Sequence, residues 1–287
     1  MSPAAIVLVV VAAFAHAGWN TSAKRAGTGG SVFVWLYATM SVVLLVPAAV
    51  VDLLVTNTSP APSWVLALGI TGVLHTAYFV LLQLGYAKGD MSVVYPLARG
   101  TGPLLAVLFA VVVLGERPGV VALAGGLAVV VGVFVIGGAG AATGGGRRWV
   151  GVAYGVVTGI TIAGYTLWDA HSVTTLGVPP LVQLCGSVVV ESAVLAPVAL
   201  AKRAELATLW QDHRRDAAVV AVLSPLAYTL ILYALRIAPV AVVAPARELA
   251  IVIGGVIAWR VLHEPNPARR LAGAAIVLAG VFALAVG

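Results

Sequence analysis

The chain has 287 residues, of which 61% are apolar and only 9% are charged. A soluble domain carries roughly 25% charged residues, so this composition excludes a globule that faces water on all sides. The net charge of +6 comes from basic residues at the ends of apolar segments. They form no basic stripe, which argues against nucleic-acid binding and favours contacts with anionic lipid headgroups.

The apolar segments predict an all-α membrane protein with ten transmembrane helices. A spanning helix needs about 20 apolar residues, so ten of them with short loops fill the chain. The longest breaks are the glycine-rich loop 137–148 and the polar connector 202–216. The predicted spans cover residues 3–22, 31–51, 64–86, 91–114, 119–138, 149–170, 178–200, 217–236, 239–262 and 268–286.

Ionisable, polar and aromatic side chains inside these spans are the candidate functional residues. A charge in hydrocarbon is costly, so each one is a functional hypothesis, although helix packing is a simpler role for any single aromatic residue. Tyr228 could also line a cavity. In chain order, the candidates for substrate binding are Trp19, Asn20, His75, Tyr78, Tyr95, Arg99, Tyr165, Trp168 and Arg247.

Glu191 and Glu248 are candidates for ion coupling, because a carboxyl group in an apolar bundle could carry a proton. A simpler alternative is that they pair with Arg99 and Arg247 as buried anchors that touch no substrate. The two alternatives are compatible, because an arginine held by a carboxylate can be released to a ligand.

The two arginines belong to an internal repeat. Superposing Arg99 on Arg247 also superposes Glu116 on Glu264, each near the end of its span. We therefore expect two five-helix repeats, over residues 1–138 and 149–287. An odd number of spans in each repeat makes the second an inverted copy of the first.

Inversion brings both arginines close to the middle of the membrane. Arg99 and Arg247 each lie eight residues after the start of a predicted span, which corresponds to a depth of about 12 Å. Binding sites of transporters with inverted repeats form at this depth, between the repeats. Pro96 and Pro103 flank Arg99, and Pro245 precedes Arg247, so we expect a broken helix at each arginine.

Lysine and arginine set the expected orientation. The loops that follow odd-numbered spans hold twelve of these residues, and the opposite side, including both chain termini, holds only Arg117 and Arg236. The positive-inside rule therefore predicts cytoplasmic odd-numbered loops and termini that face outward.

Several of these residues form a recognisable pattern. Trp19-Asn20 followed by Lys24, Leu114-Gly-Glu116 and Leu262-His-Glu264, together with the five-plus-five arrangement, resemble the EamA-type transporters of the drug/metabolite transporter superfamily. The resemblance implies transport of small metabolites, commonly amino acids or related polar compounds, through a central cavity. It also implies cytoplasmic termini, opposite to the orientation predicted from lysine and arginine.

These observations predict a secondary transporter rather than an enzyme. We expect a small polar metabolite, such as an amino acid, carboxylate or phosphonate, to cross the bacterial inner membrane by alternating access. An intramembrane enzyme or a channel is the alternative, but the sequence has no His-Glu-x-x-His motif, no Gly-x-Ser-x-Gly motif and no polar pore stripe. We expect a monomer or homodimer in contact with membrane lipids, and no cofactor or metal, since the single Cys185 excludes a cysteine-built site.

Overall fold

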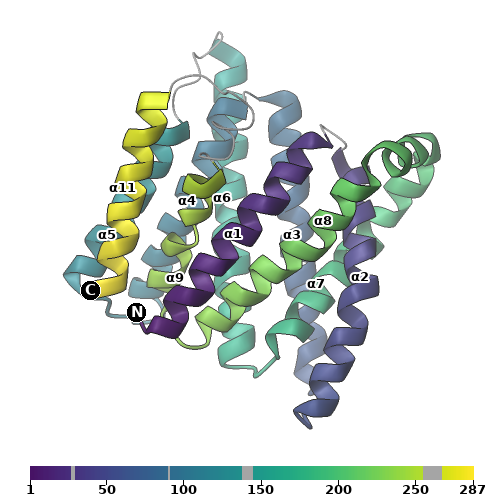
Figure 1. Ribbon diagram of the computed structural model, residues 1–287, viewed down its shortest axis with the longest axis horizontal. Coiled ribbons are helices and arrows are strands. Elements are labelled where there is room, and N and C mark those ends of the chain that lie inside the picture. The colour runs from purple at the N-terminus through teal and green to yellow at the C-terminus, as the bar shows by residue number, and fades with distance from the viewer. Residues whose placement is uncertain (27–29, 90, 138–144, 255–266) are drawn as a thin grey trace.

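The computed structural model describes residues 1–26, 30–89, 91–137, 145–254 and 267–287, and every regular element within them is a helix (Figure 1). A helix satisfies its own backbone hydrogen bonds, which is required wherever no water can replace them. The helices are α1 (Pro3–Arg25), α2 (Gly30–Val55), α3 (Pro62–Lys88), α4 (Met91–Val112), α5 (Val120–Gly137), α6 (Gly145–Thr174), α7 (Pro180–Ala201), α8 (Arg203–Leu235), α9 (Val240–Ala246) and α11 (Pro267–Val286).

Seven of the described helices, α1 to α4 and α6 to α8, are long and apolar enough to cross a membrane. The apolar parts of α5 and α11, Val120–Ile136 and Leu271–Val286, are shorter. Part of the predicted span 239–262 lies outside the described residues. The all-helical membrane class is therefore confirmed, while the number of ten spans stays a prediction.

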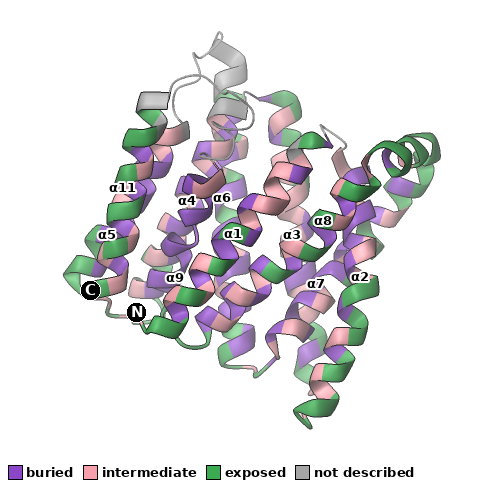
Figure 2. Cartoon of the chain, viewed as in Figure 1, coloured by how far each residue is buried: buried purple, intermediate pink, exposed green. Residues whose placement is uncertain are grey.

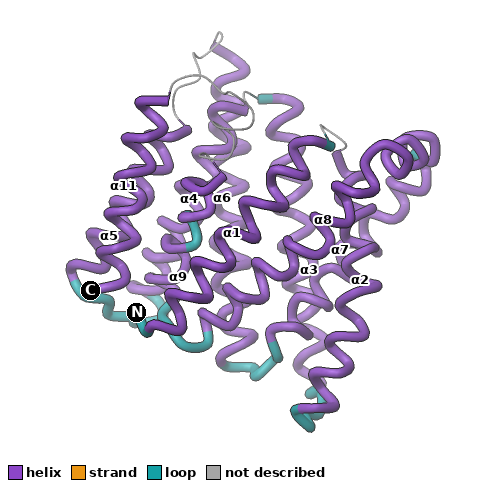
Figure 3. The backbone as a smooth tube through the Cα atoms, in the orientation of Figure 1, coloured by secondary structure: helices purple, strands orange, loops and turns teal. Residues whose placement is uncertain are grey.

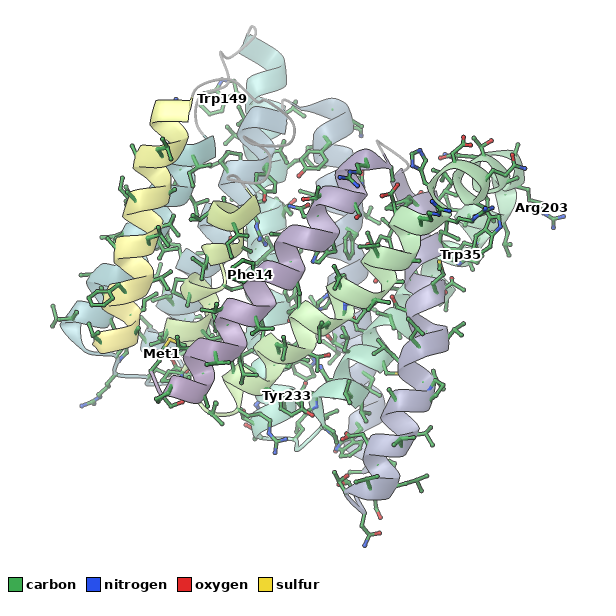
Figure 4. The ribbon with its side chains drawn as sticks, viewed as in Figure 1. Met1, Phe14, Trp35, Trp149, Arg203 and Tyr233 are labelled. Atoms are coloured by element: carbon green, nitrogen blue, oxygen red, sulfur yellow. The ribbon has the colours of Figure 1, made fainter. Side chains whose placement is uncertain are left out.

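The helices expose apolar side chains on the outside of the bundle (Figure 2). Phe14 on α1, labelled in Figure 4, is 62% exposed. A soluble protein would bury most of these groups, so the exposed apolar surface fits lipid as the surrounding solvent.

The prediction of a polar connector at 202–216 is wrong. Helix α8 begins at Arg203 and continues without a break to Leu235. This segment contains no glycine or proline and is rich in alanine, leucine, glutamate and arginine, which favour helix. Leu209 is buried on the inner side of this extension while Trp210 is half exposed, so its first turns are amphipathic.

Helices of the first half pack mainly against helices of the second half. Contacts join α1 to α8, α3 to α6, α2 to α7 and α5 to α11 (Figure 3). The equivalent helices of the two halves are α1 and α6, α2 and α7, α3 and α8, and α5 and α11. If the halves are exchanged, the α1–α8 pair becomes the α6–α3 pair, and the α2–α7 and α5–α11 pairs stay the same. Both termini lie at one end of the bundle (Figure 1), where the Met1 amine donates a hydrogen bond to the Ala285 carbonyl oxygen at 2.9 Å.

Four glycines allow α5 and α11 to pack closely. A Cβ atom built on Gly125 would lie 2.7 Å from the Gly280 carbonyl oxygen, and one built on Gly132 would lie 2.9 Å from the Gly273 carbonyl oxygen. Gly125, the earlier of the two on α5, thus meets Gly280, the later of the two on α11, and Gly132 meets Gly273. The two helices therefore run antiparallel.

The expectation of a broken helix holds at Arg247 and is wrong at Arg99. Helix α9 ends at Ala246, and a turn at Arg247 and Glu248 precedes further helical residues. Helix α4 stays continuous through Arg99, with Pro96 and Pro103 inside it. A proline removes one backbone donor, which weakens a helix without always ending it.

Glu116 caps the helix that leads to Arg247. Its two carboxylate oxygens accept hydrogen bonds from the backbone N–H groups of Val240 and Ala241, each at 2.9 Å. Gly115 has a φ of +70°, a left-handed conformation that glycine tolerates and that turns the chain after α4 toward α9. The matching Glu264 lies outside the described residues.

Candidate functional site

A pocket opens at the centre of the bundle, between helices of both halves. Its cavity volume is about 100 Å³, and its wall is formed by α1, α2, α3, α4, α6, α7, α8 and the turn after α9. Small-molecule sites occupy roughly 300–1,000 Å³, so this cavity has room for a small ligand only. Its polar and aromatic lining residues are His16, Trp19, Tyr37, Ser41, His75, Tyr78, Phe79, Arg99, Tyr165, Ser187, Glu191, Ser224, Tyr228 and Arg247.

Two buried arginines share one carboxylate at this pocket. Arg99 Nε lies 3.2 Å from Glu248 Oε2, and Arg247 Nε lies 3.7 Å from Glu248 Oε1. Glu248 is fully buried, and both arginine side chains are only 7% exposed. Because arginine keeps its charge in proteins, the three side chains together carry a net charge of +1.

The arginines retain free capacity to bind an acceptor. Neither ion pair has the alignment of a hydrogen bond, so Arg247 Nε and Nη2 and both Glu248 oxygens are buried without a hydrogen-bond partner. Arg99 Nη2 lies 3.3 Å from His16 Nε2. Buried donors without partners are unfavourable, and an anion on Arg247 would satisfy them.

Glu191 stands apart from the arginines. It lies on α7, lines the pocket and is 3% exposed, and its Oε1 atom has no hydrogen-bond partner. Among the described residues it forms no ion pair. The pocket therefore has a cationic region at the arginines and a separate carboxyl group on the α7 side.

A third buried carboxyl group, that of Asp169 on α6, lies behind the pocket wall. It is fully buried and accepts hydrogen bonds from the Thr71 hydroxyl, the Gln183 amide at 2.9 Å and the Tyr228 hydroxyl at 2.6 Å. His75 Nε2 lies 3.0 Å from Asp169 Oδ2. Asp169 thus joins α6 to α3, α7 and α8.

Aromatic rings connect this carboxylate to the arginines. The Tyr165 ring centroid lies 4.2 Å from that of His75 and 6.0 Å from that of Tyr228. The Arg247 guanidinium lies 5.8 Å from the centroid of the same Tyr165 ring, at cation–π distance. Tyr78 packs edge-on against Tyr165 at 5.7 Å.

Comparisons with known proteins identify the family of this chain. The model of the EamA-like transporter family matches residues 3–138 and again residues 149–286. The chain belongs to the EamA-like transporter family. It is therefore a multi-pass membrane protein of a transporter family.

The fold of this EamA-like transporter is also found in a solved structure. A solved crystal structure, described only as that of a protein, superposes on this chain with a TM-score of 0.78. The two sequences are 19% identical, and the superposition covers 98% of this chain and 96% of that one. At this identity the likeness concerns the fold alone. No curated protein matches the sequence.

The transporter's pocket brings together most of the residues that the sequence singles out. Arg99, Arg247, His75 and Glu191 line it. Glu248 lies behind the arginines rather than on the pocket surface. The aromatic candidates that also line the pocket are Trp19, Tyr78 and Tyr165.

Three predicted binding residues do not line this pocket. Trp168 donates its indole N–H to the Ala67 carbonyl oxygen at 3.1 Å and so joins α6 to α3. Tyr95 lies one turn before Arg99 on α4, and Asn20 follows Trp19 on α1, but neither is a lining residue.

Sequence reasoning missed the roles of His16 and Asp169. Both lie beside predicted residues, His16 one turn before Trp19 and Asp169 directly after Trp168. Their position inside the bundle was the missing information, since polar residues near a span end are equally compatible with the membrane interface. The described residues contain no group of three or more histidine, cysteine, aspartate or glutamate side chains that could hold a metal ion.

Proposed function

We propose that this protein is a secondary transporter for a small polar metabolite that carries a carboxylate or phosphonate group. The observation that carries the proposal is the pair of buried arginines, which share a single carboxylate at a central pocket. A net positive charge at such depth is costly unless an anion compensates it. The substrate's acidic group is the natural partner.

On Arg247, the acidic group of the substrate would then take the place of the Glu248 carboxylate. Arg247 has two guanidinium nitrogens without a hydrogen-bond partner, so an acidic ligand can bind there while Glu248 keeps its contact with Arg99. Arginine binds carboxylate and phosphonate groups through two parallel hydrogen bonds, which favours this class over neutral compounds. Aromatic side chains such as Trp19 and Tyr78 give the pocket an apolar wall for the rest of the molecule.

Alternating access would use the two halves as moving parts. The antiparallel packing of α5 against α11, which occupy equivalent positions in the two sequence units, supports an inverted repeat. In such transporters one repeat rocks against the other around a fixed central site. We propose that the halves, each of which contributes one arginine, expose the pocket to the two sides of a bacterial inner membrane in turn.

Ion coupling is proposed for Glu191 rather than Glu248. Glu248 compensates two arginines, so its protonation would leave two buried cations without an anion. Glu191 has no such partner and can bind a proton or a cation on its own. The Glu191→Gln protein should exchange substrate across liposomes but fail to accumulate it against a gradient; full accumulation would exclude this role.

The ligand class can be tested by thermal stability in detergent with matched compounds. Butyrate, 4-aminobutyrate and butylamine share a carbon chain and differ in charge, and ethylphosphonate and 2-aminoethylphosphonate extend the set. We expect acidic or zwitterionic members to raise the melting temperature and butylamine to have no effect. Stabilisation by butylamine alone would contradict the proposal.

The same measurement on variants tests the site. Arg247→Ala should abolish the stabilisation, because it removes the guanidinium that has free donors. Arg236→Ala is the matched control, since Arg236 is exposed at the end of α8, and it should respond to ligand like the unmodified protein. An equal response in both variants would place the binding site elsewhere.

A further inference from the structure

We propose that His75 and Asp169 form a proton-binding site next to the arginines. The site is distinct from Glu191 and Glu248, the two carboxyl groups that the sequence favours for ion coupling. Its use in transport rests on the proposed function, whereas proton binding by the pair does not. The two can therefore be tested separately.

The geometry makes Asp169 an acceptor on both oxygens. Oδ1 receives the Thr71 hydroxyl and the Gln183 amide, and Oδ2 receives the Tyr228 hydroxyl. His75 Nε2 lies 3.0 Å from Oδ2 and completes the set. A carboxylate with four partners is well compensated although it is fully buried.

His75 connects this carboxylate to the pocket. Its Nε2 atom faces Asp169, so its other ring nitrogen, Nδ1, remains for a proton that arrives from the pocket. No hydrogen bond to Nδ1 occurs within the described residues, and the His75 side chain is 12% exposed. Histidine is the side chain that gains and loses a proton most readily near neutral pH.

The pair can change charge without leaving an isolated ion in hydrocarbon. With one proton on the imidazole it carries −1, and with a second proton it becomes a neutral ion pair. Glu191, in contrast, would be an unpaired buried anion whenever it loses its proton. The hydrogen bonds to Asp169 therefore make the pair a second site that can exchange protons, in addition to Glu191.

Tyr165 places the pair within electrostatic reach of the arginines. Its ring contacts both the His75 ring at 4.2 Å and the Arg247 guanidinium at 5.8 Å. The net charge of +1 on the two arginines and Glu248 compensates the charge of −1 on the His75–Asp169 pair before the pair binds a second proton. The other ionisable groups on the pocket wall are His16, Tyr37, Tyr78, Glu191 and Tyr228.

An anion on Arg247 removes this compensation. The negative charge of the unloaded pair is then unbalanced, so the pair gains a proton more easily. Anionic substrate and proton would consequently bind together, and each would favour the other to the same extent. This gives the proposed transporter a physical means of coupling a metabolite to a proton gradient.

Proton binding can be measured without any substrate, by nitrogen NMR of the protein with ¹⁵N-labelled histidine between pH 5 and 8. The His75 signals are those that disappear in His75→Gln or, as a second assignment variant, His75→Asn. We expect the neutral imidazole to carry its proton on Nε2 and to gain a second one on Nδ1 within this range. Signals that stay constant, or a neutral form protonated on Nδ1, would overturn the proposal.

A matched pair of variants separates this role from simple packing. Asp169→Asn removes the negative charge next to the imidazolium, so the His75 signals should no longer depend on pH as they do in the unmodified protein. Asp216→Asn is the matched control. It removes the negative charge next to His213, another histidine paired with an aspartate, whose Nδ1 atom lies 3.3 Å from Asp216 Oδ2 on α8. Asp216→Asn should leave the His75 signals unchanged. An unchanged His75 transition in the Asp169→Asn protein would contradict the assignment.

Discussion

Among single side chains, Glu248 should matter most for stability. Glu248→Gln leaves Arg99 and Arg247 buried without an anion, and loss of one partner from a buried ion pair costs about 3–5 kcal/mol. We expect a large fall in the melting temperature of the purified protein, measured by intrinsic tryptophan fluorescence.

Glu205→Gln provides the comparison for this prediction. Glu205 pairs with Lys202 at 3.0 Å, but both side chains are about half exposed. Exposed pairs contribute roughly 0–1 kcal/mol, so this variant should melt close to the unmodified protein. Equal melting temperatures for the two variants would show that Glu248 does not compensate the arginines.

The sequence identifies the arginines and His75 because ionisable groups in apolar spans are rare and costly. It offers Glu191 and Glu248 as possible partners of the arginines but does not show that both arginines share Glu248, since Arg99 and Glu248 are far apart in the chain and belong to different halves. Asp169 was missed for a local reason. The predicted span ended at residue 170, whereas α6 continues to Thr174, which places Asp169 inside the helix and next to α3 and α7.

At the scale of helices, the contact between α5 and α11 can be tested with two alanine substitutions. Gly125→Ala would put a Cβ atom 2.7 Å from the backbone oxygen of Gly280, so the two helices must separate. Gly69→Ala on α3 meets nothing within 4 Å and gains helix propensity, which stabilises by roughly 0.5–1 kcal/mol. We expect Gly125→Ala to lower the melting temperature and Gly69→Ala to maintain or raise it.

The result that contradicts this packing is a Gly125→Ala protein as stable as the Gly69→Ala protein. In that case the glycines of α5 would not be needed for close approach to α11. Both variants change a helical glycine to the same residue, so the comparison isolates the helix contact from backbone propensity.

Helix positions were well predicted from apolar segments, and helix ends were not. The polar segment 203–216 belongs to α8 and not to a loop, because it contains no helix breaker. Prolines lie near both arginines, yet only the α9 segment is interrupted. Local sequence alone does not decide whether a proline bends or ends a helix, because neighbouring helices contribute to the outcome.

For the molecule as a whole, orientation in the membrane is the clearest open prediction. The distribution of lysine and arginine places the termini outside, opposite to the arrangement that the family resemblance implies. With Cys185 replaced by alanine, single cysteines at the exposed positions Ser59 and Thr208 would report the two sides. We expect an impermeant thiol reagent added to intact cells to label Ser59→Cys and not Thr208→Cys; the reverse pattern would establish cytoplasmic termini.

The two halves each contribute one arginine to the pocket, and this joint binding site is the central feature of the account. The most direct test is exchange of radiolabelled 4-aminobutyrate, or of whichever matched compound stabilises the protein most, across proteoliposomes. Arg99→Ala and Arg247→Ala should each reduce the initial exchange rate at least about tenfold, while Arg236→Ala retains it. Exchange at the unmodified rate in both arginine variants would contradict the account.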